Sequence, residues 1–360
     1  MRALSLLLAT ACGAAAPTGP DTDLDLDTGL PRAFVPLEDD GTVPDHLGDR
    51  LCDEAAAPDA APDPVHLHCR TEGARFAPAD AVPDGPLTVM VWNLERGQRL
   101  DAQLAAWADG TLPVPDVLLA AEVDRGCTRS GDRNVPREIA QALGLDYVFG
   151  VEFLELPRPS GGGGRIDAPC EHGNAIFSRF PLGNVEARFH TTNLSWYVPP
   201  DERGGPGEPR LGGRSFLLAD MAWGDTLVRL SSLHFESRVI PPEVQWQQGE
   251  ELAAALQEVP GPVLAGGDTN AGAYSFDLAS GRTAPDEVED RTIGPLLRAG
   301  LDDAHLALPV DARPTRSGLI IDLLFGRGLG WSAPTVCPAE VCDPLSDHRA
   351  VWAEAGLLPR

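Results

Sequence analysis

The sequence contains no lysine, so all 28 of its basic residues are arginines, and 54 aspartates and glutamates outnumber them. The formal net charge is −26. A chain this acidic repels polyanions at long range and offers no basic stripe that could grip many phosphates at once. Tight, non-specific binding of nucleic acid is therefore disfavoured, whereas a metal-bridged reaction on one phosphate group is not.

Long apolar segments are missing as well, and beyond the start of the chain nothing could span a bilayer. The start, MRALSLLLATAC, has one positive residue, a short apolar run and then Cys12, which is typical of a lipoprotein leader. We expect a leader over residues 1–12 and export, either as an outer-membrane or cell-surface lipoprotein anchored at Cys12 or as a periplasmic or secreted protein. The alternative is a frayed terminus of a cytosolic protein.

The CxxC pairs of many zinc sites are also absent. Six cysteines remain after Cys12, and an even number in an exported chain favours disulfides over metal ligands. The sequence alone leaves their connectivity open. We expect nearest neighbours to pair, as Cys52–Cys69, Cys127–Cys170 and Cys337–Cys342.

What the chain does have is enough apolar material for one sizeable core, with 43% hydrophobic residues. Residues 13–49 are small, acidic and aperiodic, which predicts a disordered tether. Residues 50–86 are rich in Pro, Ala and Asp but hold two cysteines, which predicts an N-terminal arm closed by a disulfide. Residues 87–358 carry the strand and helix patterns and form the expected main domain.

Strand-like runs alternate with helical or loop segments throughout that domain. Some runs are continuously apolar and others alternate, which suits sheets covered by another sheet on one face and by helices on the other. Helices are expected over 242–259, LDAQLAAWA and REIAQALG, and the Gly- and Pro-rich stretches 161–170 and 199–213 predict long loops. The expected strands are residues 87–93, 116–123, 174–179, 215–223, 226–235, 262–268, 319–326 and 348–355.

Residues able to bind a metal or move a proton stand at the ends of several of these strands. A single carboxylate there is more often a turn or cap residue, but a series in order along the chain is hard to explain by turn chemistry. Loops at strand ends are where α/β proteins usually build their sites. The candidates are Asn93, Glu122, His234, Asp268 with Asn270, and Asp347 with His348.

Hydrolysis of a phosphate ester would use these residue types. Mg²⁺, with Mn²⁺ as an alternative, prefers carboxylate and water ligands, for which Glu122 and Asp347 are suited. The attacking water needs a base or an orienting group, and Asp268 with the amide of Asn270 can supply it.

Proton transfer and charge neutralisation at the leaving oxygen fall to the histidines. His234 and His348 are both candidates for this role. A histidine needs an acidic partner that holds its productive orientation, and Asp322 in LIIDLLFG is the candidate for that partner.

Seven segments follow one another in the order typical of the endonuclease/exonuclease/phosphatase family, and the resemblance covers about Leu87 to Ala355. It implies an α/β (α+β) fold, a DNase I-like four-layer sandwich of two packed mixed β-sheets flanked by helices, with the active site at one edge. The segments are WNLE, AAEVDRG, HGNAIFSRFPL, SSLHFES, GGDTN, IIDLLF and LSDHR.

The resemblance also implies a role for each matching residue. Asn93 would contact the phosphate and support the metal shell, and Glu122 would be the main Mg²⁺ ligand. His234 matches the histidine that assists the leaving group, while Asp268 and Asn270 match the pair that positions or activates water.

The last matching residues lie close to the C-terminus. Asp322 matches the aspartate that orients the last histidine, and Asp347 and His348 match the metal-side aspartate and the phosphate-contacting histidine. Ala121 and Leu323 depart from the family, which usually has Gln and His there. These departures affect the expected substrate rather than the expected metal ligands.

Weaker features have two interpretations each. Arg179 could contact phosphate or pair with a structural carboxylate. His172 beside a predicted disulfide could be catalytic or structural, and Trp196 and Tyr197 could touch a lipid or base or simply pack. Four arginines could funnel an anionic substrate or form a solvated face: Arg125, Arg129, Arg133 and Arg137.

The function we predict is an exported phosphohydrolase, a phosphodiesterase with nuclease as one option, that acts as a monomer on a nucleic acid or on a small or lipid phosphodiester. One alternative is a binding module on the same fold that has lost its chemistry. Within the enzyme class a sphingomyelinase or an inositol-phosphate phosphatase is the other, although aromatic residues make up only 6% and lysine is absent.

Overall fold

The computed structural model describes most of the main domain and part of the N-terminal arm. Apart from Phe34, the described residues belong to a unit spanning Val35–Arg360, to which all that follows refers. The expected leader, including Cys12, lies outside the described residues. These are residues 34–37, 50–53, 67–79, 81–159, 164–194, 197–198, 208–237, 242–272, 275, 280 and 289–359 of 360.

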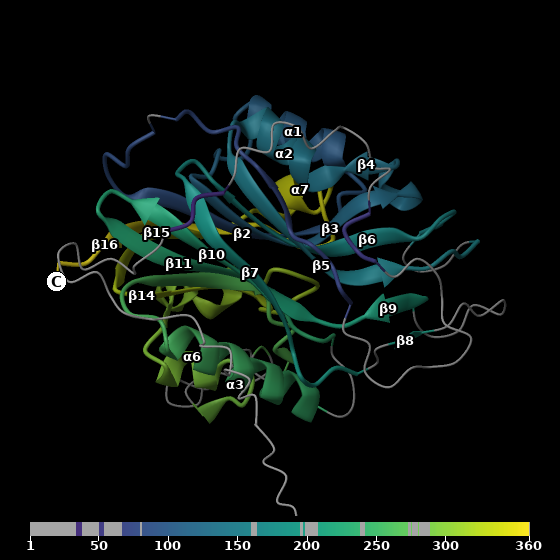
Figure 1. The fold of residues 1–360 in the computed structure, drawn as a ribbon. Helices are drawn as coiled ribbons and strands as arrows, with labels where there is room; N and C mark the ends of the chain where they lie inside the picture. Colours follow the sequence, from purple (N-terminus) through teal and green to yellow (C-terminus); the bar gives the residue numbers. More distant parts are fainter. Residues whose placement is uncertain are drawn as a thin grey trace, which may run out of the picture. The chain divides into compact units, whose positions relative to one another are not determined.

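Two mixed β-sheets form the centre of the unit (Figure 1). The first has ten strands within the described residues, and β2 and β3 are its parallel pair. Its order is β15 (Leu329–Val336), β16 (Val351–Leu357), β2 (Leu87–Arg96), β3 (Val117–Cys127), β6 (Cys170–Ser178), β5 (Asp146–Glu155), β9 (Arg210–Gly212) and β8 (Tyr197–Val198), with β1 (Glu72–Ala74) beside β5 and β4 (Arg133–Asn134) beside β3.

The second sheet has six strands within the same residues, and β11 and β12 are its parallel pair. Its order is β13 (Asp302–Asp303), β14 (Asp322–Arg327), β12 (Val263–Asp268), β11 (Thr226–His234), β10 (Ser215–Trp223) and β7 (Leu182–Phe189).

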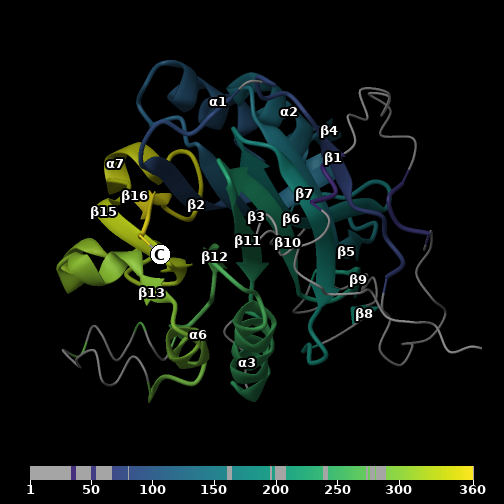
Figure 2. The same ribbon diagram turned by 60° about the vertical axis from the view of Figure 1, so that its left-hand side comes forward.

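Helices cover the outer face of each sheet. The helices α1 (Leu100–Ala108) and α2 (Val135–Leu143) lie on the first sheet, and α3 (Glu243–Gln257) and α6 (Gly294–Arg298) on the second (Figures 1 and 2). The short helix α7 (Ala339–Cys342) precedes β16. The order helices, sheet, sheet, helices is the four-layer sandwich that the family resemblance implied.

Three apolar clusters fill the spaces between these layers. Along β2 the side chains alternate as a strand requires: Val89 and Val91 point into the cluster between the sheets, and Met90 and Trp92 into the cluster beneath α1 and α2. A third cluster lies between the second sheet and α3 and α6. Burying one such side chain contributes about 1.5–3 kcal/mol, so this alternation fixes which face of β2 meets which layer.

The two parallel pairs position the functional residues. Parallel neighbours need a crossover connection, which α1 provides between β2 and β3 and α3 between β11 and β12. There is one such unit in each sheet. The predicted catalytic residues lie towards the carboxyl ends of the strands of these two units.

Two glycines of β12 allow close packing at that edge, one against the opposite sheet and one against the neighbouring strand β11. A Cβ on Gly266 would lie 2.5 Å from Val91 Cγ2 of the opposite sheet. A Cβ on Gly267, whose φ is +152°, would lie 1.9 Å from the carbonyl oxygen of Leu233. The two glycines of GGDTN are therefore needed for packing immediately before Asp268.

The N-terminal arm adds to the first sheet. Its described part contains β1, which pairs with β5, and the disulfide Cys52–Cys69. Cys127–Cys170 and Cys337–Cys342 are also bonded, so the nearest-neighbour pairing is confirmed.

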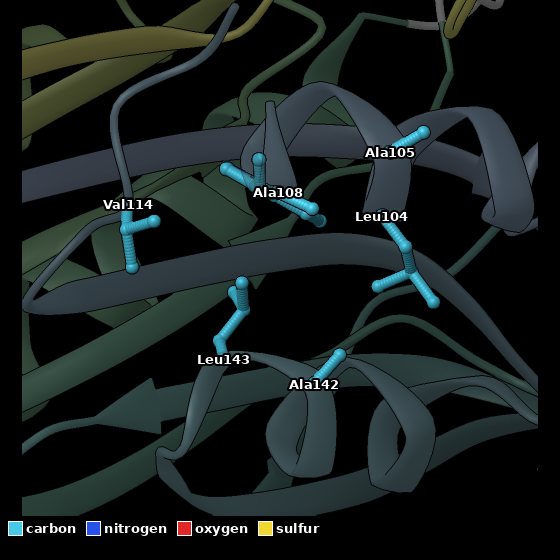
Figure 3. A pocket seen from close by; sticks show the side chains of 7 residues that line it. Leu104, Ala105, Ala108, Val114, Ala142 and Leu143 are labelled. Carbon is cyan, nitrogen blue, oxygen red and sulfur yellow. The ribbon is translucent and has the colours of Figure 1, made fainter. Parts of the chain in front are cut away.

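Other features of the fold lie away from the strand ends. In the part of the chain that the structure describes, no helix is long and apolar enough to cross a membrane. A hollow between α1 and α2 is lined by apolar side chains, among them Leu104, Val114 and Leu143 (Figure 3). It brings no group that could act on a phosphate, so we place the candidate site elsewhere.

Candidate active site

Three predicted site residues lie in one row across the second sheet. His234 of β11 is opposite Asp268 of β12, and Asp268 is opposite Asp322 of β14. His234 Nε2 lies 3.4 Å from Asp268 Oδ2. All three side chains are buried.

His348, from the segment before β16, joins this row. Its Nδ1 is 2.8 Å from Asp322 Oδ2, and its Nε2 points at Asp268 with 3.7 Å to Oδ2. Asp322 therefore contacts one ring nitrogen of His348, and the other ring nitrogen, which faces Asp268, has no hydrogen-bond partner among the described residues.

Asn93 connects the row to the first sheet. Its Nδ2 donates to Asp268 Oδ2 at 3.1 Å, and its Oδ1 accepts from the backbone N–H of Glu95 at 3.1 Å. Asn93 is fully buried. The amide thus forms a direct link between the carboxyl ends of β2 and β12.

Glu122 is aimed by an irregularity in β3. The pairing of β3 shifts register between Ala120 and Val123 against β6, and between Asn93 and Arg96 against β2. Such bulges re-aim side chains next to active sites. The side chain of Glu122 keeps 15% of its surface exposed and lies 3.4 Å from Arg96 Nη1.

The backbone is strained at this edge. Glu95, Arg96, Glu122 and Asn270 all have φ between 47° and 66°. Non-glycine residues in this region cost of order 1–3 kcal/mol each and persist where the surrounding structure holds them. Of the eight non-glycine residues with positive φ in the described chain, two thus are predicted site residues, Glu122 and Asn270, and two more lie shortly after Asn93.

Asn270 supports Asp268 through its backbone. Its N–H donates to Asp268 Oδ1 at 2.9 Å, while its side-chain Nδ2 donates to the carbonyl oxygen of Phe235 at 3.2 Å. The amide side chain therefore fixes the loop after β12, and the peptide group fixes the carboxylate.

Asp347 lies at the rim. Its Oδ2 pairs with Arg316 Nη2 at 2.6 Å, its N–H donates to Glu95 Oε2 at 3.2 Å, and its side chain is 36% exposed. Among the described contacts, none joins it directly to Glu122.

Arg179 is not brought to the site, which corrects its predicted phosphate contact. It pairs with Asp116 at 2.9 Å, at the beginning of β3. Glu122 lies about 20 Å further along that strand, at about 3.3 Å per residue. The structure therefore favours the alternative of a structural ion pair.

Electrostatics separate the roles of the buried groups. Burial raises the pKa of Asp268 to about 7. The positive charge of His348 lowers this pKa, and the negative charge of Asp322 raises it. Burial lowers the pKa of His348, but the charges of Asp322 and Asp268 outweigh it and raise the value to about 9. Near neutral pH Asp268 can exchange a proton, and His348 carries a positive charge.

Glu122 is held ionised. Burial raises its pKa, but the positive charge of Arg96, with a smaller contribution from that of His348, lowers the pKa well below the usual range. A carboxylate that stays charged at all working pH values is suited to a cation.

His234 is held neutral by a residue that the sequence did not reveal. Arg214 Nη1, which can only donate, lies 2.8 Å from His234 Nδ1, so this nitrogen accepts and the proton sits on Nε2 facing Asp268. Burial and then the charge of Arg214 lower the pKa of His234 well below its usual range. Arg214 is itself paired with buried Glu152 at 3.0 Å.

Neither Arg214 nor Glu152 could be singled out from the sequence. Arg214 directly follows a predicted loop, and Glu152 lies in β5, a strand that the pattern did not predict. A charged residue within an apolar run such as VFGVEFL was the available signal.

The residues fit a divalent cation. Within the described residues, the donor atoms of Asp268, Asp322 and His348 lie within 4.8 Å of one another, close enough to hold a metal, and Asp322 Oδ1 is buried without a hydrogen-bond partner there. Glu122 adds an ionised oxygen donor at the same edge. Oxygen-rich donors of this kind match a hard cation.

Several of the weaker sequence candidates contact carboxylates of the protein itself. His172 Nδ1 is 2.7 Å from buried Asp124. Arg125 pairs with Glu72 and Glu171, so it belongs to neither a solvated face nor a funnel. Trp196 and the side chain of Tyr197 lie outside what the structure describes.

Comparison with known proteins agrees with this architecture. The sequence model of the Endonuclease/Exonuclease/phosphatase family matches residues 90–348, more than half of the chain. None of the curated proteins matches the sequence.

Solved structures show the same fold at low sequence identity. An endonuclease/exonuclease/phosphatase from Beutenbergia cavernae is 20% identical, with a TM-score of 0.52 over 76% of this chain and 72% of that one. D. rerio TDP2 complexed with single strand DNA product is 16% identical, with a TM-score of 0.50 over 76% and 100%. The human Nocturnin catalytic domain with bound sulfate anion is 15% identical, with a TM-score of 0.50 over 80% and 97%.

At these sequence identities the structural similarity shows only that the fold is shared. Membership of the family follows from the match to the family's sequence model. The chain belongs to the endonuclease/exonuclease/phosphatase family, whose members are hydrolases that act on phosphate esters.

Proposed function

We propose that this protein is an exported, Mg²⁺-dependent phosphodiesterase that cleaves a phosphate ester by attack of water. The observation that carries the proposal is the convergence on Asp268: Asn93, His234 and His348 approach the same carboxylate oxygen at 3.1, 3.4 and 3.7 Å. A turn or cap residue would not gather an amide and two imidazoles from both sheets.

Asp268 is the proposed base. A carboxyl group with a pKa of about 7 is largely ionised just above neutral pH and can accept a proton from water there. The N–H of Asn270 and the amide of Asn93 hold its two oxygens in place.

The two histidines would act on the phosphate. His348 carries a positive charge, held by Asp322, and would stabilise negative charge that develops on the phosphate oxygens. His234 is a neutral ring because Arg214 occupies its other nitrogen, and it would stabilise the leaving oxygen by a hydrogen bond from its Nε2–H without transferring the proton.

Mg²⁺ is the proposed cofactor, with Mn²⁺ as a substitute. When bound, it would polarise the phosphate oxygens as a Lewis acid. Glu122 is the principal proposed ligand, with Asn93 and Asp347 as supporting ligands. Asp347 would have to exchange its pairing with Arg316 for this role.

The substrate would be a phosphodiester of nucleic acid, or a small or lipid phosphodiester. TDP2, a structural neighbour, is described in complex with a DNA product, and Nocturnin with a sulfate anion, which supports a phosphate-type ligand here. The net charge of −26 argues for a short substrate over a long polymer. A non-catalytic binding module is less well supported, because all residues with a proposed chemical role are retained.

Export is proposed from the leader pattern and supported by the three disulfides, which are typical of oxidising compartments. The lipid anchor at Cys12 and a monomeric state belong to the same proposal.

The decisive experiment measures hydrolysis by the purified protein. Bis(p-nitrophenyl) phosphate, single-stranded DNA, RNA, sphingomyelin and inositol phosphates would each be tested with Mg²⁺, with Mn²⁺ and with EDTA. We expect turnover of at least one diester that EDTA abolishes. Activity that survives exhaustive chelation or requires Zn²⁺ would contradict the metal assignment, and inactivity on every ester would favour the binding module.

A further inference from the structure

Three arginines converge on one carboxylate next to Glu122. Arg96 Nη2, Arg129 Nη1 and Arg158 Nη2 lie 2.8, 3.1 and 3.7 Å from the carboxylate oxygens of Glu208. We call these three residues the arginine cluster. In a protein with a net charge of −26, three guanidinium groups gathered on one carboxylate beside a proposed metal ligand require an explanation.

Arg129 would remain neutralised without Glu208. It is almost fully buried and makes a two-pronged contact with Asp124, at 2.7 and 2.9 Å, and a further one with Glu155 at 3.4 Å. Its position is therefore fixed by the fold, and Glu208 is an additional partner.

Arg158 differs, because Glu208 is its one carboxylate partner within 4.0 Å among the described residues. The residue is only 7% exposed, and its Nε and Nη2 atoms are buried without a hydrogen-bond partner in that part of the chain. Burial lowers the pKa of Arg158, and the positive charges of Arg129 and Arg96 lower it further. The negative charges of Glu208 and Glu155 raise this pKa but do not restore its usual value. A buried guanidinium with unused donors is costly unless something else pairs with it.

Arg96 joins the cluster to the candidate active site. One terminal nitrogen lies 3.4 Å from Glu122 and the other 2.8 Å from Glu208. The two carboxylates are therefore bridged by a single guanidinium group. A group that replaced Glu208 would lie next to whatever Glu122 binds.

The carboxylate of Glu208 has the geometry of an anionic ligand. Its side chain is 23% exposed, more than that of any member of the arginine cluster. Guanidinium groups bind carboxylates and phosphates through the same planar fork of donors. Glu208 thus supplies, from within the chain, the oxyanion that these guanidinium groups bind.

We propose that the arginine cluster is a subsite for a second phosphate group of the substrate, and that the Glu208 side chain occupies it when substrate is absent. This inference rests on the proposed function. It narrows the substrate to compounds whose two phosphate groups are about as close together as the two carboxylates that Arg96 bridges. The second phosphate could be a terminal monoester of a small molecule or a neighbouring backbone phosphate of an oligonucleotide, and the test separates the two.

Anion binding without metal tests the subsite independently of catalysis. Inorganic pyrophosphate and orthophosphate would be titrated into the whole protein in EDTA by calorimetry. Glu208→Gln removes the competing charge and should tighten pyrophosphate binding about tenfold or more. Arg158→Gln should weaken it by about 10- to 100-fold, while Arg298→Gln, an exposed arginine of α6, is the matched control and should leave it unaltered.

Hydrolysis then tests the link to the active site. Two chromogenic diesters are compared, thymidine 5′-(p-nitrophenyl phosphate) with and without a 3′-phosphate. Glu208→Gln should raise, and Arg158→Gln lower, the ratio of kcat/KM for the 3′-phosphorylated ester to that for the other. A short oligonucleotide without terminal phosphates forms the third arm: if Glu208→Gln raises its kcat/KM as well, the second phosphate is a backbone phosphate.

The two proposals fail in different ways. Unchanged pyrophosphate affinity in Glu208→Gln, with an unchanged substrate ratio, overturns the subsite even if diesters are hydrolysed. Glu208→Gln leaves the buried guanidinium of Arg158 without its carboxylate partner, so circular dichroism must show that the variant is folded. The double variant Glu208→Gln/Arg158→Gln removes this unpaired charge, and pyrophosphate affinity as high as in Glu208→Gln alone would also overturn the subsite. Tight pyrophosphate binding without hydrolysis of any ester would leave the subsite standing and overturn the proposed function instead.

Discussion

Asp268 is the residue at which the proposed chemistry depends most on a single atom, because three groups meet at its Oδ2. Asp268→Asn keeps the size of the side chain but removes the base. Loss of a positioned base typically costs about 10²–10⁴-fold in rate, and we expect this loss in kcat with little change in KM. Steady-state kinetics measures it, with circular dichroism to show that the variant is folded.

Glu122→Gln should behave differently, because the proposed role of Glu122 is to hold Mg²⁺. Part of its deficit should be recovered by raising the Mg²⁺ concentration, whereas that of Asp268→Asn should not. Mg²⁺ titrations of both variants separate the roles. An unaltered Mg²⁺ requirement in Glu122→Gln would mean that the metal is held elsewhere, for example by Asp268, Asp322 and His348.

The pH dependence follows from the two raised pKa values. Asp268 must lose its proton to act as a base, so activity should rise as pH passes about 7. His348 must keep its proton, so activity should fall as pH passes about 9. The charge of Asp322 raises the pKa of both His348 and Asp268, but it is a larger cause for His348. Asp322→Asn should therefore move the alkaline limb of the profile clearly to lower pH and the acid limb by less. A log(kcat) profile at fixed Mg²⁺ that keeps its alkaline limb in Asp322→Asn would refute this coupling.

Individual residues differ in how far the sequence could reveal them. Asp268, Asp322 and His348 stand in short segments with a characteristic order, and the structure brings them together. Arg214 and Glu152 act through a buried contact between β5 and the residue that precedes β10, which no spacing along the chain encodes. Arg96 stood within WNLERG, but only the bulge after Asn93 turns it toward Glu122.

At the scale of the element, β12 shows how packing restricts sequence. Gly267→Ala would place a Cβ against the carbonyl oxygen of Leu233 in β11. Backbone must move to relieve this, so we expect a loss of at least about 2 kcal/mol in the free energy of unfolding. Urea denaturation measures it. Gly356→Ala in β16, where a Cβ meets nothing within 4 Å, is the control and should stay within about 0.5 kcal/mol of the parent; equal stabilities would show that β12 can shift at no cost.

The elements that the sequence predicted are those whose pattern is local. Residues 215–223 were predicted as a strand and form β10 over the same span, and the predicted helix 242–259 is α3 over Glu243–Gln257. β5 was not predicted, because it is buried on both faces and includes Glu152 and Glu155, which pair with arginines. The short strand β9 lies within a predicted loop and exists through its pairing with β5.

For the whole molecule, the net charge of −26 sets an unusual salt dependence. Most proteins that bind nucleic acid lose affinity as salt rises. Here added salt screens the repulsion between an acidic surface and a polyanion. We expect KM for a long single-stranded DNA to fall between about 10 and 150 mM NaCl, with little change for bis(p-nitrophenyl) phosphate; a rise in KM for DNA with salt would indicate a basic binding surface.

The hydrogen bond between Asn93 and Asp268 is one of several polar contacts that join the two sheets, which are packed mainly through apolar side chains. The catalytic group is therefore divided between two layers, with Asn93 and Glu122 on one and His234, Asp268 and Asp322 on the other. A slide of one layer over the other by a single residue spacing, about 3.3 Å, would separate these partners without breaking a strand pairing. Heating should therefore end catalysis while both sheets are still intact. The turnover rate then reports the alignment of the two layers, and not the presence of secondary structure.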